Sequence, residues 1–110
     1  YRKIYKRGKP VVFCVPSGNF GNICAGVMAS AVGLPVHQFI AATNANDTVP
    51  RYISSGKYEP HPTVRTLSNA MDIADPSNFP RVLEIMKLKN KHQYIIEHQV
   101  VVIKEKILEK

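Results

Sequence analysis

The feature that most constrains the fold is a pair of short apolar segments separated by a glycine-containing loop and an alanine-rich stretch. Val11–Val15 is a continuous run of β-branched and other apolar residues, typical of a strand buried on both faces of a parallel sheet. Ile23–Val32 favours a helix, with Gly33 as its expected C-terminal cap. Val36–Ala42 predicts a second buried strand. Strand, loop, helix and strand form a βαβ unit, which predicts neighbouring parallel strands joined by a right-handed crossover.

The predicted fold class is therefore α/β, with three layers, a parallel sheet and the helix packed across the strands. Small residues in the helix would let it lie close to the sheet: Ala25, Gly26, Ala29 and Ala31. The chain has 110 residues, which is enough for one small domain with a single core. Its apolar content of 45% and charged content of 21% are ordinary for a globular protein.

Two shorter helices are expected beyond the second strand. Asp47 or Thr48 is placed to cap a helix that continues through Ser55. Residues 57–65 contain two prolines and little periodicity, which favours a loop. Apolar residues at helical spacing then predict another helix: Phe79, Val82, Leu83 and Met86. From Lys87 onward the pattern leaves strand and helix open.

The net charge of +7 belongs mainly to the two ends of the chain. The first nine residues hold five basic and no acidic side chains, and from Lys87 onward six lysines face three glutamates. The sequence thus divides into a basic segment 1–10, an α/β segment 11–86 and a lysine-rich segment 87–110. Nucleic-acid modules spread cations over a folded face and interleave them with aromatic side chains. The central segment lacks such a stripe, which disfavours nucleic acid as a partner.

Neither targeting signals nor cysteine chemistry indicates a specific function. No apolar run approaches the roughly 20 residues of a membrane-spanning helix, and no secretory signal pattern is present. We therefore expect a soluble, cytoplasmic protein without a membrane partner. Two cysteines are too few for a disulfide framework, so Cys14 and Cys24 are expected to be small buried apolar residues.

The loop after the first strand is the strongest candidate for a binding site. Ser17–Asn22 places two glycines directly before a helix, at the edge of a parallel sheet where ligands bind. Glycine permits positive φ and close approach of the backbone to a ligand. The free amides and dipole of the following helix favour an anion such as phosphate. A tight turn that needs glycine only for its geometry is an equally good interpretation of this pattern alone. The spacing matches neither the dinucleotide-binding nor the P-loop motif.

Four blocks of sequence resemble the threonine synthase family and decide between these interpretations. Their positions are residues 15–35 (VPSGNFGN, then AG and GLP), residues 42–51 (ATNANDTVPR), residues 66–73 (TLSNAMDI) and residues 76–81 (PSNFPR). They occur in the family's order, which speaks against chance similarity. The resemblance fades at both ends, and the segment from Lys87 onward matches no part of the family.

The resemblance implies part of a domain of a pyridoxal 5'-phosphate enzyme of fold type II, similar to the tryptophan synthase β-subunit group. Such an enzyme converts O-phospho-L-homoserine and water to L-threonine and phosphate. The family's loop binds the cofactor phosphate, mainly through backbone N–H groups, at Ser17, Gly18, Asn19, Phe20, Gly21 and Asn22. Neighbours of the substrate or the cleft would be Asn44, Asn46, Asp47, Ser68, Asp72, Ser77 and Asn78.

No catalytic residue is assigned within this chain. The reaction requires a lysine that forms a Schiff base with the cofactor, and no lysine here lies in a matching motif. We therefore expect the chain alone to be inactive. Two alternatives remain: a truncated or degenerate α/β protein that binds at most phosphate and, less favoured, a basic nucleic-acid-binding protein.

The remaining titratable groups receive structural interpretations. Asp47 is expected to be a helix cap rather than an acid catalyst. His37 is expected to be a partly buried strand residue and His61 to be exposed. His92 and His98 are six positions apart, unlike the i, i+4 histidine pair of a helical metal site, so no metal is predicted.

Overall fold

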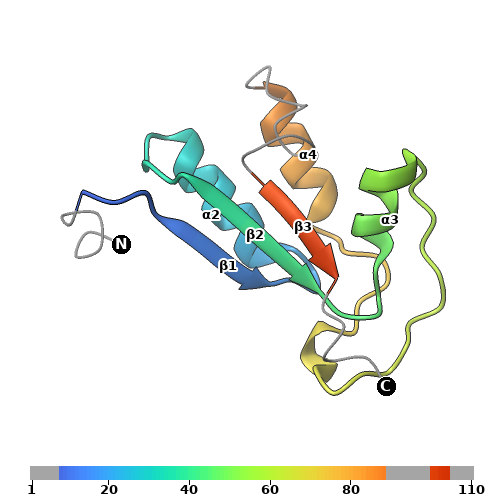
Figure 1. Ribbon diagram of the computed structural model, residues 1–110. Coiled ribbons are helices and arrows are strands. Elements are labelled where there is room, and N and C mark those ends of the chain that lie inside the picture. Colours follow the sequence, from blue (N-terminus) through green and yellow to red (C-terminus); the bar gives the residue numbers. More distant parts are fainter. Residues whose placement is uncertain (1–7, 89–99, 105–110) are drawn as a thin grey trace.

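The predicted parallel sheet is present and contains three strands. The computed structural model describes residues 8–88 and 100–104. The strand order is β1 (Val12–Pro16), β2 (Gln38–Thr43) and β3 (Val100–Lys104), with all neighbours parallel (Figure 1). Phe39 is paired with Phe13 on one side and with Val100 on the other. β3 lies in the segment from Lys87 onward, whose sequence pattern favours neither strand nor helix.

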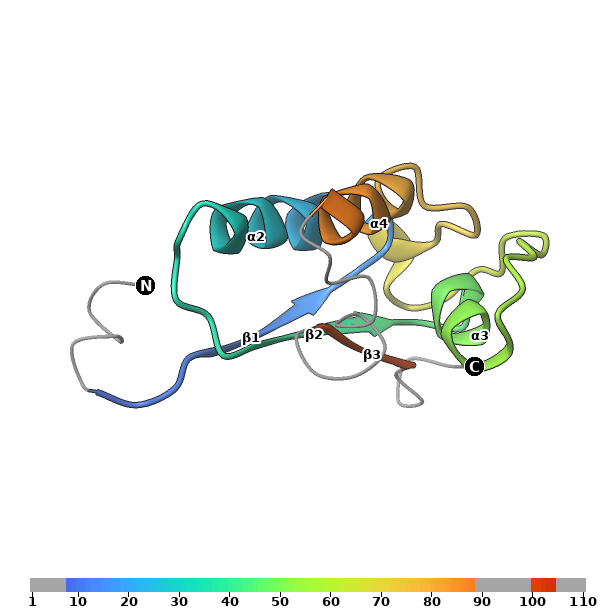
Figure 2. The same ribbon diagram turned by 90° about the horizontal axis from the view of Figure 1, so that it is seen from above.

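Three helices occupy the predicted regions: α2 (Gly21–Ala31), α3 (Thr48–Ser55) and α4 (Phe79–Leu88). The short 3-10 helix η1 (Asn69–Met71) lies in a stretch for which the sequence predicts no helix. α2 and α4 lie side by side on one face of the sheet, whereas α3 lies near the end of β3 (Figure 2). α2 begins two residues earlier than predicted, so Gly21 and Asn22 belong to its first turn.

The core lies between the sheet and the layer formed by α2 and α4. It includes Phe39 and Val100 from the sheet, Ile23 from α2 and Phe79 from α4, each at most 3% exposed. The close helix–sheet approach expected from small residues occurs at Gly26. A Cβ atom at that position would lie 2.7 Å from Cε1 of Phe39, so the aromatic ring occupies the space that a side chain would need.

The opposite face of the sheet departs from the sequence-based prediction. β1 alternates in burial rather than being buried on both faces: Val12 is 45% exposed and Cys14 is exposed, whereas Cys24 on α2 is buried as predicted. The reason is that α2 and α4 cover only the face that carries Phe39 (Figure 2). A helical layer on the second face, expected from the three-layer prediction, does not occur among residues 8–88 and 100–104.

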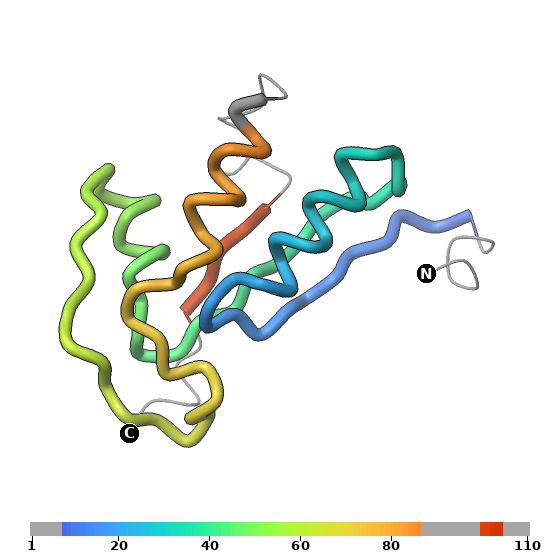
Figure 3. Tube along the Cα trace, turned by 180° about the vertical axis from the view of Figure 1, so that it is seen from behind, coloured from blue at the N-terminus to red at the C-terminus, as the bar shows by residue number. Residues whose placement is uncertain are grey.

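The chain between α3 and α4 passes around the carboxyl ends of the strands (Figure 3). This path brings η1 close to the loop that follows β1, although the two are far apart in the sequence. None of the helices in the described part of the chain is long and apolar enough to span a membrane.

Candidate functional site: an anion-binding loop

The loop Ser17–Asn22 connects the carboxyl end of β1 to the first turn of α2, as predicted. Ser17 fixes its beginning and is 4% exposed. Its backbone N–H donates to the carbonyl of Ala42 at 2.8 Å, which ties the loop to the end of β2. Its hydroxyl donates to the carbonyl of Val15 at 2.9 Å. The loop therefore starts from a rigid position at the edge of the sheet.

The positive φ that the sequence assigned to glycine occurs at Phe20 instead. Phe20 adopts the left-handed conformation, with φ 62° and ψ 19°, just before α2 begins. A residue with a Cβ atom costs roughly 1–2 kcal/mol in that conformation. The phenyl ring of Phe20 is 3% exposed and packs edge-on against Phe79, with ring centroids 5.4 Å apart. This aromatic contact and the burial of the ring offset the backbone cost.

Gly18 is required for space rather than for its backbone angle. A Cβ atom on Gly18 would lie 2.8 Å from Cα of Met71, closer than real Cβ contacts allow. The same atom on Gly21 would lie 3.4 Å from Nδ2 of Asn78, which is ordinary contact distance. The η1 segment therefore lies directly against the backbone of Gly18, and only glycine allows this approach.

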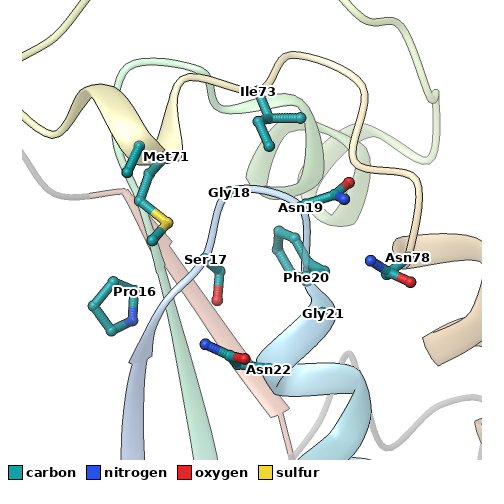
Figure 4. A pocket seen from close by; sticks show the side chains of 11 residues that line it. Pro16, Ser17, Gly18, Asn19, Phe20, Gly21, Asn22, Met71, Ile73 and Asn78 are labelled. Atoms are coloured by element: carbon teal, nitrogen blue, oxygen red, sulfur yellow. The ribbon is translucent and has the colours of Figure 1, made fainter.

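The loop borders a cavity of about 220 Å³, and none of the described residues that line it carries a charged side chain (Figure 4). These are Pro16, Ser17, Gly18, Asn19, Phe20, Gly21, Asn22, Ala70, Met71, Ile73 and Asn78. Within residues 8–88 and 100–104, no acceptor pairs with the backbone N–H groups of residues 18–23; the first bond of α2 runs from Cys24 N–H to the carbonyl of Phe20. Consecutive unpaired amides at a helix N-terminus are suited to bind an anion.

Asn19 connects this loop to the beginning of α4. Its side-chain Oδ1 accepts hydrogen bonds from the backbone N–H of Ser77 at 2.6 Å and from the Ser77 hydroxyl at 2.8 Å. The backbone N–H of Asn78 donates to the carbonyl of Asn19 at 3.2 Å. The structure thus places Ser77 and Asn78 beside the loop, and Asn78 also lines the cavity.

Asn44, Asn46, Ser68 and Asp72 come together in a second hydrogen-bond network. Nδ2 of Asn44 donates to Asp72 Oδ1 at 2.9 Å and to Ser68 Oγ at 3.0 Å. Oδ1 of Asn44 accepts from the backbone N–H and from Nδ2 of Asn46, at 2.9 and 3.0 Å. None of the four lines the loop cavity. The network instead joins the end of β2 to the segment that carries η1, and so fixes the position of Met71.

Thr66 completes this network and was not singled out as a site residue from the sequence. Its hydroxyl donates to Asp72 Oδ1 at 2.7 Å and its backbone N–H donates to Oδ2 at 3.0 Å. The hydrogen bond from the Thr66 hydroxyl is the main cause that lowers the pKa of the Asp72 carboxyl, and desolvation opposes it. Met71 was also missed. The signal for both residues is that they lie in the block 66–73 that resembles the family, whereas the contact of Met71 with Gly18 depends on the tertiary path.

Asp47 neither lines the loop cavity nor belongs to the hydrogen-bond network of Asn44, and the predicted capping interaction is wrong. It occupies the N-cap position of α3, but its side chain makes no capping hydrogen bond. The carboxylate instead contacts Arg51 Nε at 2.8 Å and Lys104 Nζ at 3.4 Å. Burial raises the pKa of Asp47, but the hydrogen bonds and positive charges of Arg51 and Lys104 outweigh it and lower the pKa overall. Asp47 therefore fastens α3 to β3, away from the loop cavity.

The structure describes two of the four histidines. His61 is exposed, as expected, and its Nε2 lies 3.3 Å from Nη1 of Arg51. His37 is exposed and lies just before β2, so the prediction of a partly buried strand residue is wrong. His92 and His98 lie outside the described residues. Within the described ranges, no three histidine, cysteine, aspartate or glutamate residues are grouped as a metal site requires.

Comparisons with known proteins connect this geometry to one enzyme family. No protein-family model matches the chain. Threonine synthase of Serratia marcescens is 61% identical over 79 residues, which cover 72% of this chain and 18% of that protein. Threonine synthase of Escherichia coli is 56% identical over 79 residues, covering 72% and 18%.

Solved structures show the same relation in three dimensions. The crystal structure of E. coli threonine synthase matches with a TM-score of 0.75 and 48% identity, covering 86% of this chain and 21% of that one. A structure of threonine synthase from Brucella melitensis, described as bound to PLP, matches with a TM-score of 0.73 and 33% identity, covering 89% and 26%. The chain spans about a fifth of the length of the curated relatives. In sequence and in fold, this chain is a homologue of one segment of threonine synthase.

Proposed function

We propose that this chain supplies the part of a threonine synthase that binds the phosphate group of pyridoxal 5'-phosphate. The observation that carries the proposal is the run of unpaired amides at residues 18–23, of which residues 18–22 border the cavity at the start of α2. Phosphate oxygens are strong acceptors, and backbone N–H groups at a helix N-terminus are suited donors. The similarity to a threonine synthase described as bound to PLP supports the same ligand.

The residues present fit a phosphate held by neutral donors. Among the described residues, the cavity lining has no lysine, arginine or carboxylate, so the attraction that this part of the chain supplies comes from the amide hydrogen bonds and the dipole of α2. The dipole contributes on the order of 0.3–1 kcal/mol, and the hydrogen bonds add to it. The backbone of Gly18, free of a side chain, lies open to the ligand on the side that Met71 does not occupy.

The proposed reaction of the whole enzyme converts O-phospho-L-homoserine and water to L-threonine and phosphate, in the cytoplasm. Pyridoxal 5'-phosphate, when bound, supplies an electron sink for the substrate carbons. The role of this chain is to hold and orient the cofactor by its phosphate. In the 110-residue chain alone, we propose phosphate binding without turnover, because no lysine lies in a motif that matches the family and none of the described residues that line the cavity is a lysine. Asn44, Asn46, Ser68 and Asp72 support the cavity wall, and Ser77 and Asn78 border the loop.

A segment exchange tests this proposal in a working enzyme. The part of E. coli threonine synthase that matches residues 11–86 is replaced by those residues of this chain. We expect the chimera to bind pyridoxal 5'-phosphate and to release phosphate from O-phospho-L-homoserine, because 56% of the matched positions are identical to those of the enzyme. The measurements are cofactor absorbance and phosphate release. A folded chimera that fails to bind the cofactor would contradict the proposal.

A further inference from the structure

Among the described residues, Asn19 is the one residue of the loop whose side chain is hydrogen-bonded to the segment just before α4. The Ser17 hydroxyl bonds to Val15 in the strand that precedes it, and the side chain of Asn22 has no hydrogen-bond partner among the described residues. Asn19 Oδ1, in contrast, accepts two hydrogen bonds from Ser77, at 2.6 and 2.8 Å. The loop is therefore attached to the start of α4 through a single side chain.

These contacts also determine the orientation of the peptide between Asn19 and Phe20. The carbonyl of Asn19 accepts from Asn78 N–H on the side of α4. In a trans peptide the carbonyl and the following N–H point in opposite directions, so the N–H of Phe20 points away from α4. The hydrogen bonds to the Asn19 carbonyl and to the Asn19 side chain thus both restrict the orientation of this peptide. The next residue, Phe20, has the left-handed backbone conformation. Few other backbone conformations of Phe20 would keep the loop in the same position.

The same contacts fix the orientation of the Asn19 side-chain amide. Its Oδ1 accepts both hydrogen bonds from Ser77, one from the backbone N–H and one from the hydroxyl. We propose that Asn19 and Ser77 form a positioning pair that keeps the amides of residues 18–23 aligned for the anion. This inference rests on the proposed phosphate-binding role of the loop.

Ser77 gives a clean test because it does not line the cavity. In the full 110-residue chain, Ser77→Ala removes the hydroxyl donor and leaves the backbone donor in place. We expect it to raise the Kd for inorganic phosphate about two- to tenfold, in line with the worth of one hydrogen bond. Asn19→Ala should raise the Kd further because it removes both bonds. The double variant should equal Asn19→Ala, because Ser77 then has no partner left.

Ser54→Ala serves as the matched control. The Ser54 hydroxyl bonds at 2.9 Å to the carbonyl of Pro50 within α3, away from the loop, so the phosphate Kd should stay unchanged. Urea unfolding of each variant separates altered stability from altered affinity. Unchanged affinity in Ser77→Ala together with weakened affinity in Asn19→Ala would overturn the positioning pair and leave the proposed function standing. Absence of phosphate binding by the unaltered chain would overturn both.

Discussion

Replacing Gly18 by alanine should weaken phosphate binding by at least tenfold and destabilise the chain. The added Cβ would lie 2.8 Å from Cα of Met71, which is backbone and cannot move away by a side-chain rotation. Either the loop or the η1 segment must shift, and overpacking of this kind costs typically 1–3 kcal/mol. A shifted loop no longer aligns the amides of residues 18–23. Urea unfolding and a phosphate titration of the same variant measure the two effects.

Gly21→Ala is the control for the free energy of unfolding. It adds the same methyl group in the same loop, but at 3.4 Å from Nδ2 of Asn78, where it fits. Gly21 is the first residue of α2, and alanine is preferred to glycine in helices by up to about 1 kcal/mol. We therefore expect stability to be unchanged or slightly increased. Equal destabilisation by the two substitutions would show that the contact with Met71 is not the cause.

Asn44→Ala should be the most destabilising of the polar substitutions. Asn44 is 2% exposed, and its side chain joins the end of β2 to both Ser68 and Asp72. Truncation leaves the buried backbone N–H of Asn46 without its partner and removes one hydrogen bond each from Ser68 and Asp72. An unpaired buried group costs about 1–3 kcal/mol. We expect the free energy of unfolding to fall by about 2–3 kcal/mol. Because the network also fixes Met71 against Gly18, phosphate affinity should decrease in the same variant.

Asn69→Ala is the matched control for Asn44→Ala. Asn69 belongs to η1, is exposed, and its side chain has no hydrogen bond with any described residue. Its replacement should change the free energy of unfolding by no more than about 0.5 kcal/mol, as is usual for surface positions. If Asn44→Ala proves as mild as Asn69→Ala, the network does not hold the segment in place.

The βαβ unit was predictable because its signals are local. Apolar runs mark β1 and β2, and alanine-rich sequence with a following glycine marks α2. β3 could not be assigned, since Val100–Lys104 is short and its pairing with β2 depends on residues far away in the sequence. The prediction that β1 is buried on both faces was wrong for Val12 and Cys14, because the described helices cover only the other face.

The candidate site was predictable in position but not in its internal geometry. The glycines placed the loop correctly, yet the left-handed residue is Phe20, since its ring gains a buried contact with Phe79. Sequence patterns assign positive φ to glycine and carry no information about that contact. The pairing of Asn44 with Asp72 and of Asn19 with Ser77 likewise depends on how the chain returns to the sheet edge after α3.

The most direct test maps where the phosphate group binds. Backbone amide shifts of the 110-residue chain are followed during titration with inorganic phosphate, with pyridoxal 5'-phosphate and with pyridoxal, which lacks the phosphate. We predict that the two phosphate-bearing ligands move the amides of residues 18–23 first and most, and that pyridoxal leaves them unchanged. Shifts centred on the basic residues 1–10 or on the lysine-rich residues 87–110, with residues 18–23 unaffected, would contradict the account.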